Sequence, residues 1–237
     1  MKKHLIAAAC MVLFSGSFIC EAQTSKSDPS DVQGWFGAGF KLDLPKKWNV
    51  MFDYQSRFYN NIKTYNGSYI SLGVNKKIIP LLDLLAEYRL ALVNKGNYHR
   101  YSFGGELNKG IRKIDLSLRV LFQNQLQDFD DTTKLNEKSN YWRARFGVKY
   151  RFLKIFDLYA SVEPIMKFGG RYFVDNWRNT VGIKVKVLPG TKIDLYYIYR
   201  PDYAKSYNRT FHVIGLNVDY TLKIGKKGKG KKKDQKK

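Results

Sequence analysis

The chain of 237 residues is poor in cysteine and has no apolar run that could cross a bilayer as a helix. Its two cysteines, Cys10 and Cys20, lie near the N-terminus, so the rest of the chain is predicted to have neither disulfides nor thiol chemistry. The apolar stretch at residues 5–14 is shorter than the roughly 20 residues that a transmembrane helix needs. A mean hydropathy of −0.42 also argues against a helical membrane protein.

Histidine is equally scarce, which limits the enzymatic chemistry that the sequence can support. Only His99 and His212 lie beyond the N-terminal segment, and neither has a serine at the spacing typical of outer-membrane phospholipases. Asp128, Asp130 and Asp131 lack the spacing of a dedicated calcium loop. With no Gly-rich phosphate loop and no Cys/His metal pattern, the sequence predicts no catalytic residues, no metal site and no cofactor.

The N-terminal segment has the layout of a secretion signal. Two lysines precede the apolar residues 5–14, and the small residue Ala22 ends the segment. We interpret residues 1–22 as a signal peptide that is cleaved after Ala22. Lipidation of Cys20 is the alternative, and the bulky Ile19 before it disfavours this cleavage.

The rest of the chain repeats one unit, in which about ten residues of alternating apolar and polar character are followed by a break. Short breaks, such as residues 44–47 and 188–191, alternate with longer polar ones, such as residues 127–140. Aromatic residues make up 15% of the chain and cluster near the ends of the candidate strands, as in the aromatic belts of membrane proteins. This pattern predicts an all-β fold: a transmembrane antiparallel up-and-down β-barrel.

Eleven candidate strands can be counted between residues 34 and 224. Single-chain bacterial barrels have an even number of strands, which keeps both chain ends in the periplasm. The prediction is therefore about 12 strands (range 10–12). Residues 23–33 would form an atypical first strand or a periplasmic segment, and residues 34–224 the barrel. The expected location is the outer membrane of a Gram-negative cell, with the C-terminus in the periplasm.

One face of the candidate strands carries charged side chains that a barrel would enclose. Both signs are present, with an excess of positive charge. The favoured interpretation is a polar plug, in which opposite charges pair across the lumen. The alternative is an anion path, because rings of basic side chains select anions; its basic cluster would be Arg119, Arg143, Arg145 and Arg178. The other inward residues are Asp53, Arg57, Glu87, Arg89, Glu106, Asp115, Lys149, Glu163, Lys167, Lys184, Lys186 and Asp194.

The formal net charge of +22 bears on the partners of the protein. The Lys-rich residues 225–237 are expected to be disordered in the periplasm, either solvated or held against an anionic periplasmic surface. Nucleic acid is not an expected partner of an exported chain. The expected partners are outer-membrane lipid and lipopolysaccharide, whose phosphates could contact Lys95, Arg100, Arg171 and Lys205 in outer loops. The oligomeric state cannot be inferred.

The whole predicted barrel resembles a known family in several short motifs. These are residues 32–35 and 44–48, residues 98–104, 118–123 and 141–146, and the closing residues 212–216. The resemblance is to an uncharacterised domain-of-unknown-function family of outer-membrane β-barrels from the Bacteroidota. It implies the fold and the location, and the family carries no established activity.

The sequence therefore supports a first hypothesis of a non-enzymatic outer-membrane β-barrel, which is a small channel or a structural component with a basic, largely plugged lumen. Two alternatives stay open. One is an outer-membrane lipid-metabolising enzyme of the phospholipase kind. The other is a soluble periplasmic binding protein of the lipocalin kind.

Overall fold

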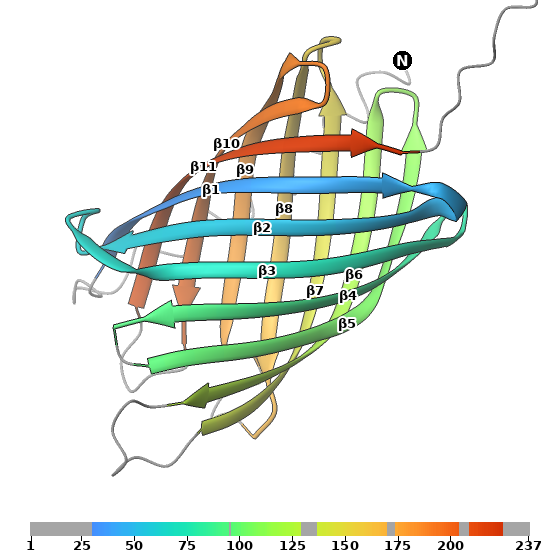
Figure 1. The fold of residues 1–237 in the computed structure, drawn as a ribbon. Coiled ribbons are helices and arrows are strands. Elements are labelled where there is room, and N and C mark those ends of the chain that lie inside the picture. Colours follow the sequence, from blue (N-terminus) through green and yellow to red (C-terminus); the bar gives the residue numbers. More distant parts are fainter. Residues whose placement is uncertain (1–29, 95, 129–136, 170–173, 204–208, 225–237) are drawn as a thin grey trace, which may run out of the picture.

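The computed structural model describes residues 30–94, 96–128, 137–169, 174–203 and 209–224, and these residues form a closed β-barrel (Figure 1). The predicted signal peptide, the C-terminal lysines and the loop residues Lys95, Arg171 and Lys205 lie outside the described residues. The strands are β1 (Ser30–Leu44), β2 (Trp48–Tyr59), β3 (Thr64–Ile79), β4 (Leu82–Val93), β5 (Gly96–Ile111), β6 (Ile114–Asp128), β7 (Glu137–Arg151), β8 (Phe156–Lys167), β9 (Asn176–Leu188), β10 (Thr191–Asp202) and β11 (Arg209–Lys223).

The barrel closes through one parallel pair of strands, which we call the seam. Every other pair of neighbouring strands is antiparallel, whereas β1 runs parallel to β11 from Ser30 opposite Thr210 to Asp43 opposite Lys223. An odd number of strands that run alternately up and down makes the first and the last point the same way. The fully antiparallel arrangement expected from the sequence is therefore wrong at this one position.

The predicted eleven segments are confirmed as strands, and a separate strand before them is not formed within the described residues. Residues 30–33 instead extend β1 toward its N-terminal end, where each residue pairs with β11. The count of eleven lies inside the expected range but below the preferred number of twelve. As a consequence, β1 begins at one rim of the barrel and β11 ends at the other.

The two rims differ in the connections that they carry. The turn rim holds the short connections, namely the 3-10 helix η1 (Pro45–Lys47) and residues 80–81, 112–113, 152–155 and 189–190. The loop rim holds the connections at residues 60–63, 94–95, 129–136, 168–175 and 203–208. Two of these, residues 60–63 and 94–95, are as short as the turn-rim connections, because β3 begins at Thr64 and β5 at Gly96. The predicted alternation of short and longer breaks is confirmed for the other three.

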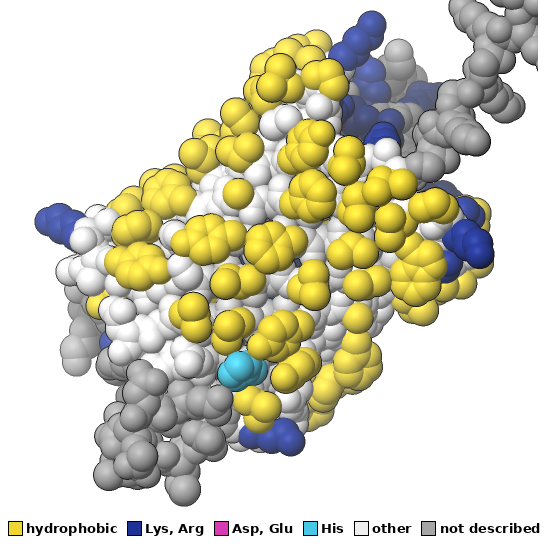
Figure 2. All heavy atoms as spheres, viewed as in Figure 1, with side chains coloured by type: hydrophobic (Ala, Val, Ile, Leu, Met, Phe, Trp, Pro, Cys, Tyr) yellow, Lys and Arg dark blue, Asp and Glu magenta, His cyan; other side chains and the backbone are white. Residues whose placement is uncertain are grey.

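The outer surface is apolar, as the alternating pattern predicts. On β7, for example, Trp142, Phe146 and Tyr150 are 42%, 50% and 39% exposed, although all three are large hydrophobic side chains. Figure 2 shows such side chains spread over the face of the barrel that β1–β5 form, while Lys and Arg gather near the end where β1 turns into β2. The described residues include no helix that is long and apolar enough to cross a membrane.

A small apolar wall lies inside the barrel, against the seam. Trp35 of β1, Val213 of β11, and Tyr196 and Ile198 of β10 are all buried and pack together. Gly215 stands between Trp35 and Tyr196 in register, and a Cβ atom there would overlap the ring of Tyr196. The glycine therefore makes room for the aromatic ring, and the parallel seam is covered from within by apolar side chains.

Candidate functional site

The lumen contains all four arginines of the basic cluster predicted from the sequence, but the structure divides them by their partners. Arg143 on β7 is the most fully paired. Its Nη2 and Nε atoms lie 2.7 and 3.1 Å from Glu163 Oε1, and its Nη1 donates to Gln123 at 3.2 Å. Only 13% of the Arg143 side chain and 8% of the Glu163 side chain are exposed. The charge of Arg143 is therefore largely cancelled at short range.

Arg119 and Arg145 share one carboxylate. Arg119 Nη2 lies 2.7 Å from Glu106 Oε2, and Arg145 Nη2 lies 3.7 Å from Glu106 Oε1. Since the two guanidinium groups face a single carboxylate, this group keeps a net charge of about +1. These ion pairs join neighbouring strands along one wall and do not cross the lumen as the plug interpretation expected, but they partly cancel the charge as that interpretation requires.

Arg178 on β9 differs from the other three. No carboxylate lies within ion-pair distance of it among the described residues, and its Nε atom is buried without a hydrogen-bond partner. Arg200 on the neighbouring β10 is in the same situation: its Nε atom is buried and unpartnered, and its guanidinium lies 4.3 Å from the centre of the Phe211 ring. Neither arginine forms an ion pair among the described residues, although Glu163, which faces Arg178 in register, and Asp202 and Asp175 near Arg200 offset part of their positive charge.

Arg57 on β2 completes this group. Its guanidinium carbon lies 3.8 Å from the ring centres of both Trp35 and Tyr69, and its Nε donates to Gln55 at 2.7 Å. Stacking between two aromatic faces fixes the plane of the guanidinium but leaves N–H donors at its edge. Among the described residues Arg57 has no ion pair, and its charge is felt by both Arg178 and Arg200. We call Arg57, Arg178 and Arg200 the unpaired arginine triad.

Sequence reasoning missed Arg200 and misplaced Arg100. Arg100 was expected in an outer loop against lipopolysaccharide; in the structure it lies on β5, is 12% exposed, and pairs with Glu87 at 3.3 Å. The reason is that β5 starts at Gly96, which brings Arg100 onto the same inward face as Glu106. Every second residue of a strand faces the same side, so counting back in steps of two from Glu106 leads to Arg100. The same count forward from Asp194 leads to Arg200.

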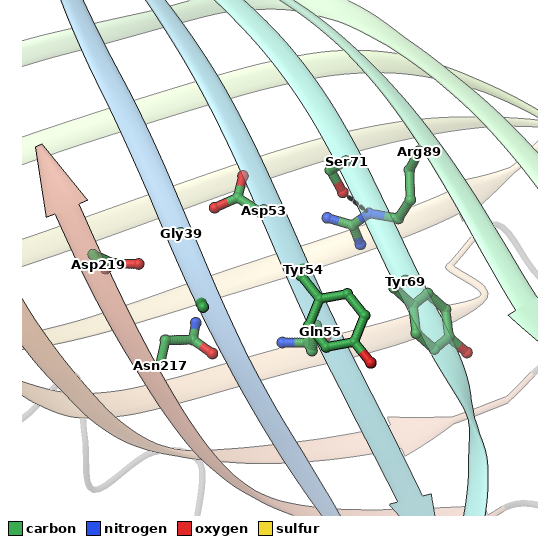
Figure 3. A pocket seen from close by; sticks show the side chains of 10 residues that line it. Gly39, Asp53, Tyr54, Gln55, Tyr69, Ser71, Arg89, Asn217 and Asp219 are labelled. Atoms are coloured by element: carbon green, nitrogen blue, oxygen red, sulfur yellow. Dashed lines mark hydrogen bonds between the residues drawn. The ribbon is translucent and has the colours of Figure 1, made fainter. Parts of the chain in front are cut away.

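A cavity opens in the lumen beside the seam, and its lining includes Tyr69, on whose ring Arg57 stacks (Figure 3). Its volume is about 190 Å³. Two carboxylates in it, Asp53 and Asp219, have neither an ion pair nor a hydrogen bond among the described residues, in contrast to Asp194, which lies 3.2 Å from Lys184 Nζ. Its lining comprises Ala38, Gly39, Asp53, Tyr54, Gln55, Tyr69, Ser71, Arg89, Asn217 and Asp219.

The two histidines lie on the outside of the barrel, each beside a tyrosine. His99 Nδ1 is 2.9 Å from the hydroxyl of Tyr88, and His212 Nδ1 is 2.6 Å from the hydroxyl of Tyr197. In both pairs the rings stack. His99 belongs to β5 and not to a loop. Within the described residues there is also no group of acidic, histidine or cysteine side chains that could hold a metal ion.

Comparison with known proteins identifies a family and a fold. The model of the family described as "Protein of unknown function (DUF2490)" matches residues 32–210. No curated protein sequence matches the chain. Among solved structures, the chain is similar to the NanC porin in its rhombohedral crystal form, with a TM-score of 0.53 and 13% identity over 81% of this chain and 99% of that one. At this identity the likeness concerns the barrel fold alone.

A second solved structure, OccK8 (OprE) of Pseudomonas aeruginosa, is similar at a TM-score of 0.37 and 9% identity. The match covers 70% of this chain and 57% of that one, and it is too weak to support any argument about this protein.

Proposed function

We propose that this chain, which belongs to the family of proteins of unknown function DUF2490, is an outer-membrane β-barrel that forms a narrow, anion-preferring passage. The apolar outer face supports the membrane location. Large hydrophobic side chains such as Phe103 (59% exposed) and Leu195 (51%) point outward around the barrel. A soluble lipocalin-like protein would expose these side chains to water, whereas a bilayer would bury them.

The orientation follows from the two rims. Short turns are periplasmic and longer loops extracellular in bacterial barrels, so we place the turn rim and the end of β11 in the periplasm. The start of β1 then lies on the extracellular side. A single cysteine in place of Asn61 should react with a membrane-impermeant maleimide on intact cells, and one in place of Lys154 should not. The reverse pattern of labelling would overturn this orientation.

The unpaired arginine triad is the observation that carries the proposed anion preference. Barrels of about eight strands are filled by side chains and those of about sixteen are open, so eleven strands leave a narrow interior. In a narrow lumen, three guanidinium groups that form no close ion pair among the described residues attract anions and repel cations. Arg57, Arg178 and Arg200 come from β2, β9 and β10, which places them around the seam and opposite the paired arginines of β5–β7.

Reversal potentials in planar bilayers under a potassium chloride gradient test this function. We expect an anion-selective conductance whose selectivity falls at least threefold in the triple variant Arg57→Gln, Arg178→Gln, Arg200→Gln. The control is Arg112→Gln, which removes an exposed positive charge from the turn rim, outside the lumen, and should leave selectivity unchanged. Cation selectivity, or selectivity that survives the triple substitution, would refute the proposal.

A further inference from the structure

We infer that the cavity beside the seam binds a small zwitterion, with its ammonium group between Asp53 and Asp219 and its anionic group at Arg89. The inference rests on the proposed function, because it needs solutes to enter the lumen, and it adds a chemical class to them. The cavity brings unpaired carboxylates and an arginine to the same lumen wall, and a solute that carries both signs of charge matches both.

Register places the charged ends of the cavity in one row across five strands. Asp219 on β11 pairs with Gly39 on β1, which pairs with Asp53 on β2. Asp53 in turn pairs with Ser71 on β3, which pairs with Arg89 on β4. Neighbouring strands lie about 4.8 Å apart, so the small residues Gly39 and Ser71 form a floor between three charged side chains. Figure 3 shows Asp53 and Arg89 on either side of Ser71.

The acidic end of the row has hydrogen-bond acceptors that form no bond among the described residues. A Cβ atom on Gly39 would lie 2.5 Å from Asp219 Oδ1 and 2.8 Å from Asp53 Oδ1, so both carboxylates lean over this glycine. The buried Oδ1 atom of Asn217, which also lines the cavity, has no hydrogen-bond partner among the described residues. A primary ammonium group has three N–H donors and no acceptor. Asp53, Asp219 and Asn217 therefore offer the three acceptors that such a group requires.

The basic end is held in place and is only partly neutralised. Arg89 Nε donates to Ser71 Oγ at 2.7 Å, which directs the guanidinium toward the cavity floor. Glu87 lies 3.4 Å from Arg89 and 3.3 Å from Arg100, so one carboxylate serves two guanidinium groups. The positive charge that remains, and the planar donors of Arg89, suit a carboxylate.

The dimensions limit the solute to a small one. Since a water molecule takes up about 30 Å³ in the liquid, a cavity of about 190 Å³ corresponds to roughly six waters. Asp53 and Arg89 stand two strands apart, which separates their Cα atoms by about 10 Å, and both side chains reach inward across that gap. A short amino acid in which a few bonds separate ammonium from carboxylate has suitable dimensions.

Calorimetric titration of the detergent-solubilised full chain with three probes tests the inference. We expect 4-aminobutyrate to bind at least tenfold more tightly than butyrate, which lacks the ammonium, and than butylamine, which lacks the carboxylate. The single substitutions Asp53→Asn and Asp219→Asn should each lower the affinity for 4-aminobutyrate at least tenfold. The control is Asp83→Asn, which removes the same charge from a lumen residue outside the cavity. Asp83 accepts a hydrogen bond from Asn108 at 3.0 Å, and its substitution should not change the affinity for 4-aminobutyrate.

Equal affinities for the three probes, or an equal loss in Asp83→Asn and Asp53→Asn, would overturn the inference. Heat-modifiable migration on gels verifies that each variant is a folded barrel. The outcome is separable from that of the proposed function, which the ion selectivity of the same preparation reports. An anion-selective barrel that does not distinguish 4-aminobutyrate from butyrate would refute the zwitterion site alone. A barrel without anion selectivity that binds 4-aminobutyrate through Asp53 would refute the anion passage alone.

Discussion

The two sides of the lumen wall differ in whether their charged side chains form ion pairs. On the paired side, β4–β8, every inward-facing arginine named above lies in an ion pair, as Arg143 does with Glu163 and Arg119 with Glu106. On the seam side, β9–β11 and β1–β3, the unpaired arginine triad and the carboxylates Asp53 and Asp219 have no such partner among the described residues. Paired charges hold neighbouring strands together and cancel, whereas unpaired charges remain available to a solute.

This contrast divides the two interpretations of the lumen between two places. Charge cancellation, the premise of the polar plug, is found on the paired side, and the anion path that we propose lies on the seam side. Of the four arginines that the sequence singled out, only Arg178 belongs to the seam side, while Arg119, Arg143 and Arg145 belong to the other. The following two predictions ask whether the two sides also differ in what they contribute to stability.

The largest expected effect is on the paired side. Glu163→Gln should destabilise the barrel by about 3 kcal/mol, because it leaves the nearly buried Arg143 without its carboxylate. The measurement is the free energy of unfolding in urea, followed by tryptophan fluorescence in lipid vesicles. An unfolding free energy that stays within about 1 kcal/mol of the parent's would show that Arg143 is stabilised by solvent and not by Glu163.

The smallest expected effect is on the seam side. Arg178→Gln should change the same free energy of unfolding by less than about 1 kcal/mol, because no close ion pair is lost, and relief of the repulsion from Arg143, Arg200 and Arg57 offsets the lost attraction of Glu163. Its ion selectivity should nevertheless fall. A loss of stability as large as that of Glu163→Gln would mean that Arg178 is a structural residue, and the contrast between the two sides would not hold.

Much of the fold could be predicted because period-two alternation reports directly on which side chains face lipid and which face the lumen. Residues 141–151 illustrate this, since Arg143 and Arg145, which were predicted to face inward, form ion pairs inside the barrel, while Trp142 and Phe146 are exposed on its outer face. The family of unknown function is also confirmed, whereas its bacterial group stays a prediction. The closure of the barrel could not be predicted, because alternation within strands says nothing about whether the first and last run parallel.

The candidate site was harder to predict than the fold. Whether an arginine is neutralised depends on the residues opposite it on neighbouring strands, and that register is not visible within one strand. Arg143 forms its ion pair with Glu163 across β7 and β8, while Arg178, which faces the same Glu163 in register, forms no ion pair among the described residues. The cavity was missed for the same reason, since its acidic end is built from β2 and β11, far apart in the sequence.

The seam has a consequence for assembly. Until β11 is in place, β1 and β10 are open edges with unpaired backbone groups, so the barrel cannot close before the last strand of the chain is available. Pairing strands so distant in sequence is entropically costly and slow. Because Asp219 arrives with β11 and meets Asp53 across Gly39 only then, a nascent or truncated chain lacks the complete acidic end of the cavity. Occupancy of that cavity would thus report that a barrel has finished closing.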